Sequence, residues 1–99
     1  MVKHIVLWTL KDEVKKDSSK IAADLQKRFK ALLGVVDGLT AIEVGLNFNE
    51  GSKFDIALYC ELSSKEALEQ YQIHPAHVAI KAIVHELVCG RECADYEIQ

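Results

Sequence analysis

The chain has 99 residues, of which 49% are hydrophobic, and its 12 basic and 15 acidic side chains leave a net charge of −3. This size and composition exclude a disordered chain and predict one domain over residues 1–99. Because the basic residues form no block, nucleic acid is excluded as a partner. A membrane partner is also excluded, since no apolar run approaches the roughly 20 residues of a membrane span.

Neither the N-terminal residues nor the cysteines indicate export. The apolar run HIVLWTL meets the charged residues KDE at once and has no small-residue cleavage site, so we expect no signal peptide. The three cysteines, Cys60, Cys89 and Cys93, fit neither a disulfide framework nor paired CxxC motifs. We therefore expect reduced thiols and a cytoplasmic protein, with a metal or redox role of Cys89 and Cys93 as the alternative.

The first half of the chain predicts a strand, a helix and a hairpin. Residues 2–10 are rich in β-branched and aromatic side chains, which indicates a strand. Between residues 18 and 36 apolar side chains recur at three- and four-residue steps, which predicts an amphipathic helix. Segments 40–48 and 54–62 alternate apolar with polar or small residues around the turn sequence NEGSK, which is typical of a hairpin.

The second half predicts two short helices and a closing strand. One helix is expected from Ser63 or Ser64 through Tyr71, another from Pro75 to about Val88, and a strand over residues 91–98. The order β-α-β-β-α-β is that of the ferredoxin-like α+β fold, a four-stranded antiparallel sheet whose first strand lies beside its third.

Both faces of this sheet carry large apolar side chains, whereas one helical layer covers only one face. We therefore expect a second copy of the chain to cover the other face in a symmetric homodimer. The side of Phe54 and Leu58 is almost purely apolar and is predicted as the dimer seam. The side of His4, Asp55 and Tyr59 mixes polar groups into apolar surroundings, so we expect it to face the helices and form a pocket.

The stretch YQIHPAH, residues 71–77, places a tyrosine and two histidines around the only proline. Pro75 disfavours a helical conformation at His74 and fits the start of a new helix. The helix dipole should keep His77 neutral and able to accept a proton, while Tyr71 could donate to an oxygen gaining negative charge. From spacing alone a structural role is favoured, in which His74 satisfies backbone groups and His77 packs on the sheet.

The sequences MVKHIVLWTLKDE and YQIHPAHVAI resemble the stress-responsive A/B barrel family, also called Dabb domains. The resemblance implies a homodimeric α/β barrel. In one member, the plant polyketide cyclase that forms olivetolic acid by aldol condensation, a histidine acts as base and a tyrosine polarises the substrate carbonyl. By resemblance these catalytic roles fall on His77 and Tyr71. The matching pocket positions are His4, Val6, Trp8, Leu25, Phe29, Ala57 and Tyr59, to which we add His74 and Asp55 as substrate-binding candidates.

Two of these positions set this chain apart from the cyclase. The cyclase has a second histidine where this chain has Asp55, so we expect Asp55 and His4 to form a carboxylate–imidazole pair on adjacent strands. Trp8 is large for a cavity-lining position, which predicts a smaller pocket.

The leading functional hypothesis is cofactor-independent acid/base catalysis on a small apolar carbonyl compound, as a cyclase, isomerase or lyase. The main alternative is a non-catalytic ligand-binding or stress-protective dimer. A cofactor-free monooxygenase is a further alternative for which no residue argues. Two metal sites are weaker alternatives: a transition-metal site at His4, Asp55, His74 and His77, and Mg²⁺ at the backbone carbonyls of Leu33, Val36 and Leu39.

Overall fold

Four strands and three α-helices make up the fold in a computed structural model that describes all 99 residues. The elements are β1 (Val2–Leu10), the 3-10 helix η1 (Asp12–Asp17), α1 (Ser18–Lys30), β2 (Leu39–Leu46), β3 (Ile56–Leu62), α2 (Lys65–Ile73), α3 (Pro75–Leu87) and β4 (Val88–Glu97). The strands form one antiparallel sheet in the order β2-β3-β1-β4. The ferredoxin-like order and the pairing of β1 with β3 are thus confirmed.

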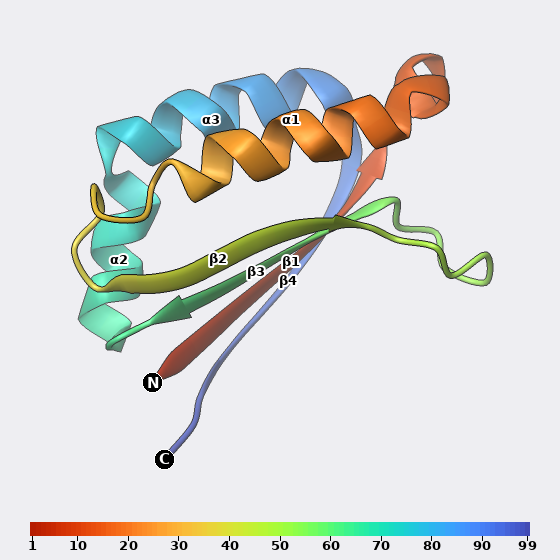
Figure 1. Cartoon of the computed structure of the whole chain (residues 1–99). Coiled ribbons are helices and arrows are strands. Elements are labelled where there is room, and N and C mark those ends of the chain that lie inside the picture. The colour runs from red at the N-terminus through yellow and green to blue at the C-terminus, as the bar shows by residue number, and fades with distance from the viewer.

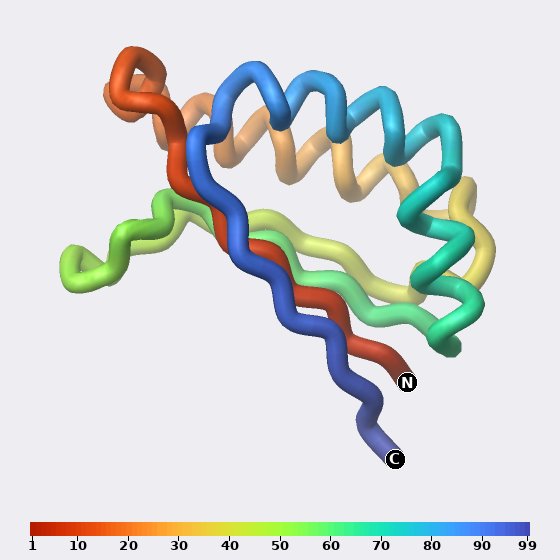
Figure 2. Tube along the Cα trace, turned by 180° about the vertical axis from the view of Figure 1, so that it is seen from behind, coloured from red at the N-terminus to blue at the C-terminus, as the bar shows by residue number.

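The helices form a single layer over one face of the sheet. Figure 1 shows α1 and α3 side by side above the strands, with α2 at one end, while the opposite face carries no helix. Seen from behind, β4 follows β1 along the edge of the sheet, and the two termini lie at the same end (Figure 2). None of the helices combines the length and apolar character needed to span a membrane.

Burial alternates along β1, which identifies the face that the helices cover. His4, Val6 and Trp8 are buried, whereas the residues between them are half-buried. In the register with β3, His4 lies opposite Cys60 and Val6 opposite Leu58. The apolar side of β3 therefore lies under the helices together with His4, and the prediction that it forms the dimer seam is wrong.

The open face of the sheet carries the alternate residues of the same strands. Ile5 lies opposite Tyr59, and Leu7 lies opposite Ala57 on one side and Glu92 on the other. The alternation of side chains within β1 and within β3 was predicted correctly. The predicted pairing of these two strands, however, was wrong by one residue. Since successive side chains point to opposite faces, that shift moved every β3 residue to the wrong side.

Two local breaks shape the helical layer. The helix expected over 18–36 ends at Lys30 and continues as turns, one of which has Gly34 in the left-handed region at φ 83°. At the other break, His74 is extended at φ −62° and ψ 130°, and its Nδ1 accepts a hydrogen bond from the Ala76 N–H at 3.1 Å. Pro75 thus starts α3 as predicted, with His74 as its N-cap.

Gly38 is the position where the turn before β2 tolerates no side chain. Its φ is +82°, and a Cβ there would lie 2.6 Å from the Ala67 Cβ and 2.9 Å from the Ser63 Oγ. Gly34 has a similar φ of +83° but has nothing within 4 Å of such a Cβ. We expect Gly38→Ala to lower the free energy of unfolding by about 2–4 kcal/mol, the sum of the left-handed strain and the overlap. Gly34→Ala should lower it by only about 1 kcal/mol.

Urea unfolding of both variants at one protein concentration checks this difference. Equal losses of unfolding free energy in the two variants would show that the residues of α2 next to Gly38 accommodate the added methyl group without an energetic cost.

Candidate active site

A cavity of about 490 Å³ lies between α3 and the edge formed by β1 and β4, with α1 behind it. This volume is in the range of small-molecule sites. Fourteen residues line it, half of them hydrophobic. The hydrophobic ones are Val6, Trp8, Phe29, Leu58, Val84, Val88 and Cys89, and the others are His4, Gln72, His77, Lys81, His85, Gly90 and Arg91.

His77 lines this cavity from the first turn of α3 and is held in one orientation. Its Nδ1 lies 2.9 Å from the backbone carbonyl oxygen of Tyr71, so in the neutral ring Nδ1 carries the proton and donates it. Nε2 is then a free acceptor. The protein provides no hydrogen-bond partner for Nε2. Since every fully buried side-chain nitrogen has a partner, Nε2 is not fully buried and can be reached by solvent or a ligand.

The charge state expected of His77 is confirmed, although its cause differs. Burial lowers the pKa of His77 to about 4, and the Tyr71 carbonyl, which acts in the opposite direction, does not offset this effect. The imidazole is therefore neutral at pH 7. The sequence argument relied on the helix dipole, whereas the loss of hydration inside the fold is the larger effect.

Tyr71 packs behind His77 and does not line the cavity. The two rings stack with centroids 3.9 Å apart and 16° between their planes. The Tyr71 side chain is fully buried, the Cys60 thiol donates to its hydroxyl at 3.8 Å, and burial raises its pKa. Stacking on Tyr71 and the contact with Phe29, at 6.0 Å between centroids, fix the plane of the His77 ring.

His4 forms the carboxylate–imidazole pair that was expected, but with a different partner. Its Nδ1 pairs with the Asp95 carboxylate of β4, which lies directly opposite His4 in the register, and the Cys93 sulfur lies 3.6 Å from the same nitrogen. Burial and the nearby Asp95 raise the pKa of the Cys93 thiol. The carboxylate thus leaves His4 Nε2 as the ring nitrogen without a partner in the protein.

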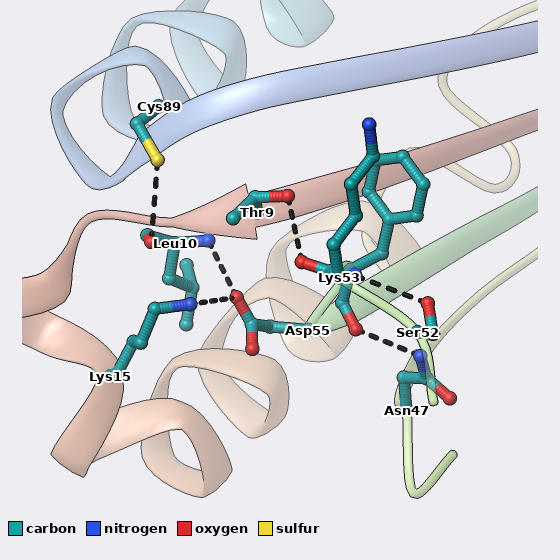
Figure 3. Close-up of polar contacts among 9 residues, drawn as sticks. Thr9, Leu10, Lys15, Asn47, Ser52, Lys53, Asp55 and Cys89 are labelled. Atoms are coloured by element: carbon teal, nitrogen blue, oxygen red, sulfur yellow. Dashed lines mark hydrogen bonds and ion pairs between the residues drawn. The ribbon is translucent and has the colours of Figure 1, made fainter. Parts of the chain in front are cut away.

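Asp55 lies outside the cavity, so its predicted pairing with His4 is wrong. It precedes β3 and receives hydrogen bonds from the Lys15 ammonium at 2.9 Å and the Leu10 N–H at 2.8 Å (Figure 3). Burial disfavours the charged carboxylate, but these two donors more than offset it and lower the pKa of Asp55. Asp55 therefore ties β3 to the end of β1 and to η1.

The remaining predicted pocket residues divide between the two faces. Val6, Trp8 and Phe29 line the cavity, and the Trp8 and Phe29 rings stack at 5.9 Å. Leu25 is buried in the core beside the cavity, and His74 caps α3. Ala57 and Tyr59 lie on the open face, because the β1–β3 register puts them opposite Leu7 and Ile5.

Sequence reasoning missed the α3 wall and the β4 rim. Besides the predicted His77, the side chains of Lys81, Val84 and His85 follow the helical spacing of α3 and line the cavity, and Val88 continues this wall at the start of β4. The period of α3 could have identified this stripe. Arg91 and Asp95 belong to the cavity side only through the pairing of β4 with β1, which no local signal indicates.

The residues proposed for metals are only partly brought together. Of the four transition-metal candidates, His4 and His77 share the cavity, whereas Asp55 and His74 lie elsewhere. The Val36 carbonyl, one of the three proposed for Mg²⁺, already accepts a hydrogen bond from the Leu39 N–H at 3.3 Å.

Comparisons with known proteins agree with this architecture. A dimeric protein of unknown function from Bacteroides fragilis, with a ferredoxin-like fold, is 38% identical, with 98% of this chain and 95% of that chain covered and a TM-score of 0.87. An uncharacterized protein of Streptomyces coelicolor is 33% identical over 98% of this chain and 99% of its own length. A hydroxynitrile lyase from Passiflora edulis shares the fold, at 13% identity, 99% and 93% coverage and a TM-score of 0.78. The pattern of the stress-responsive A/B barrel domain matches residues 2–98, and the chain belongs to this family.

Proposed function

We propose that this protein is a homodimer that performs cofactor-independent acid/base catalysis on a small, mostly apolar carbonyl compound, as a cyclase, isomerase or lyase. The observation that carries the proposal is the state of His77. This imidazole is neutral, fixed through Nδ1, and leaves Nε2 unpaired in the wall of a cavity whose lining is half hydrophobic. A positioned neutral imidazole is free to accept a proton at pH 7, and its pKa of about 4 makes it a weaker base than an ordinary histidine.

The proposed first step is removal of a proton from the carbon next to the substrate carbonyl. His77 Nε2 takes the proton, and the electron pair of the C–H bond moves into the carbonyl, which becomes an enolate. In a cyclase the enolate carbon then attacks a second carbonyl. In an isomerase the enolate takes a proton on its opposite face or at a conjugated carbon. The imidazolium returns its proton to the product, so no redox partner is needed.

A donor that stabilises the enolate oxygen completes the proposed mechanism, and Tyr71 and His4 are the two candidates. Tyr71 retains the role that the family resemblance implies, but its hydroxyl is buried against Cys60. His4 already lines the cavity, and because its Nδ1 donates to Asp95, its Nε2 can donate to the enolate oxygen only when the ring is an imidazolium. For Tyr71 to donate a hydrogen bond to the enolate oxygen, its hydroxyl must turn away from the Cys60 thiol and toward the substrate.

The proposal is tested by deuterium exchange in a probe ketone. The protein is incubated in D₂O with 4-phenylbutan-2-one, whose aromatic body and methyl ketone suit an apolar cavity, and loss of the protons next to the carbonyl is followed by NMR. We expect exchange above the buffer rate that disappears after heat denaturation. Exchange that is equal in native and denatured samples would contradict the catalytic proposal.

Tyr71→Phe separates the hydroxyl of Tyr71 from its ring. Phenylalanine keeps the stacking on His77, so a loss of exchange reports on the hydroxyl alone. If the hydroxyl stabilises the enolate, the rate should fall about 100-fold, the effect of removing one oxyanion donor. A rate within about threefold of the wild type would remove the hydroxyl from the mechanism and leave His4 as the donor. Near-ultraviolet circular dichroism verifies that the aromatic packing is retained.

A non-catalytic ligand-binding dimer is the second candidate, and the burial of the Tyr71 hydroxyl favours it. In that case the cavity would bind the ketone without exchanging its protons. Binding of 4-phenylbutan-2-one, measured by ligand-observed NMR in the absence of exchange, distinguishes this function from the catalytic one.

The homodimer is proposed to form through the open face of the sheet. Ile5, Leu7 and Ala94 line a shallow groove of about 120 Å³ on this face, which no helix covers. Polar side chains surround this apolar centre, and Lys3 lies 5.4 Å from the centre of the Tyr59 ring. An apolar centre with a polar rim is the usual composition of a subunit interface.

A further inference from the structure

Charge is distributed unevenly between the cavity and the rest of the molecule. Acidic residues outnumber basic ones in the chain by 15 to 12. The cavity wall, however, contains Lys81 and Arg91 and no aspartate or glutamate. The lining thus carries two cations and no carboxylate although the protein as a whole is negative, and a cleft lined by positive charge attracts anions.

Neither cation of the cavity is neutralised by the protein. The four ion pairs of the chain are His4–Asp95, Lys15–Asp55, Arg28–Asp24 and Lys65–Glu97, and they include neither Lys81 nor Arg91. The Lys81 ammonium donates one hydrogen bond, to the Gln72 carbonyl at 2.7 Å, which fixes it at the cavity wall. An ammonium has three donors, so two remain for a ligand.

The two cations stand at a defined place relative to the histidines. Lys81 follows His77 by four residues, about 6 Å along α3 on the same face. Its charge adds to burial in lowering the pKa of His77, which reflects how close the two groups lie. Arg91 on β4 lies opposite Trp8 on β1. Trp8 follows His4 by four residues of the strand, so Arg91 lies about 13 Å from His4 along the strand direction. The apolar Trp8 and Phe29 rings line the same cavity and stack on each other at 5.9 Å between centroids.

We propose that the cavity binds small apolar carboxylates, with the carboxylate held by Lys81 and Arg91 and the apolar body packed on Trp8 and Phe29. The inference rests on the proposed function in one respect, namely that the reacting carbonyl of the bound ligand points toward His77. A keto acid with an aromatic or aliphatic body therefore fits the cavity better than a neutral ketone. An arginine and a lysine together supply directional and point-charge recognition of a carboxylate.

The test compares two ligands that differ only in charge, 4-oxo-4-phenylbutanoate and 4-oxo-4-phenylbutanamide. Their affinities for the full-length protein are measured by isothermal titration calorimetry at 50 mM NaCl. We expect the acid to bind about tenfold more tightly than the amide, since charge-assisted hydrogen bonds replace neutral ones. Raising NaCl to 500 mM should weaken binding of the acid and leave that of the amide unchanged.

Variants assign this preference to the two side chains. Lys81→Gln and Arg91→Gln should each weaken binding of the acid about threefold, and the double variant should bind acid and amide equally. Lys20→Gln, which removes a charge from the exposed surface of α1, should retain the full preference. All three sites are at least partly exposed, so folding is expected to be unaffected.

The proposal is overturned by equal affinities in the wild type, by a preference that persists in the double variant, or by binding of neither compound at millimolar concentration. Failure here is distinct from failure of the catalytic proposal. A ketone that exchanges without any carboxylate preference would support catalysis alone. A carboxylate preference without exchange would support the anion site alone.

Discussion

His77→Asn should abolish deuterium exchange in 4-phenylbutan-2-one while the protein stays folded. The Nδ2 of asparagine occupies the place of the histidine Nδ1 and can still donate to the Tyr71 carbonyl, 2.9 Å away in the wild type. The Nε2 acceptor is lost, together with the part of the ring that stacks on Tyr71. Since general base catalysis contributes about 10²- to 10⁴-fold, we expect the exchange rate to fall at least 100-fold.

His74→Asn is the matched control for this variant. His74 belongs to the same motif, but its ring caps α3, and asparagine is a favoured N-cap residue. Exchange in this variant should stay within about twofold of the wild type. If His77→Asn retained the wild-type rate, or if both variants lost it equally, His77 would not be the base.

The pH dependence of the wild type follows from the same histidine. Because the pKa of His77 is lowered to about 4, exchange should be nearly constant from pH 8 to pH 5 and fall as the pH approaches 4. The same low pKa also makes the free energy of unfolding depend on pH. Between pH 6.5 and 4 the unfolded state binds a proton at this position that the folded state does not, so acid destabilises the fold. His77→Asn should reduce this loss of stability in urea unfolding across the same range.

Leu7→Glu should convert the dimer to a monomer. Leu7 is half-buried at the centre of the open face, opposite Ala57 and Glu92 on the neighbouring strands. In a dimer joined through this face, the new carboxylate would be buried without a partner and would lie close to Glu92. An unpaired buried charge costs several kcal/mol, so the dimer dissociation constant should rise on the order of 100-fold. Sedimentation across a dilution series measures this change.

Val35→Glu is the control for the dimer prediction. Val35 is an apolar residue, 53% exposed, in the turns after α1 and away from the open face, so its variant should remain dimeric. Ala94→Lys tests the same face on β4 with an exposed residue and a smaller risk to folding. A wild-type dissociation constant in both Leu7→Glu and Ala94→Lys would place the dimer interface elsewhere.

The two sets of predictions address independent features of the structure. The His77 variants act on the cavity under the helices, whereas the Leu7 and Ala94 variants act on the opposite face of the sheet. A monomeric Leu7→Glu protein that still exchanges deuterium would show that one protomer contains the complete site.

The elements and their order could be predicted from the amino-acid sequence, because they depend on local signals. Apolar periodicity identified the strands and helices, and Pro75 located the joint that brings His77 next to Tyr71. His77 and His4 were selected as site residues through the family resemblance, since spacing alone favoured a structural role for His77.

The side chains that surround these two histidines could not be predicted, because long-range strand pairing and packing bring them together. The pairing of His4 with Asp95 joins residues 91 positions apart, and the pairing of β1 with β3 moved Asp55 away from His4. Alternation along a strand is the same in either phase, so the sequence predicts two faces without saying which one the helices cover. Packing favours burial of the side with Leu58 and Cys60, because this side of β3 is apolar whereas the other carries Tyr59 and Glu61, and no buried side-chain polar atom is left unpaired.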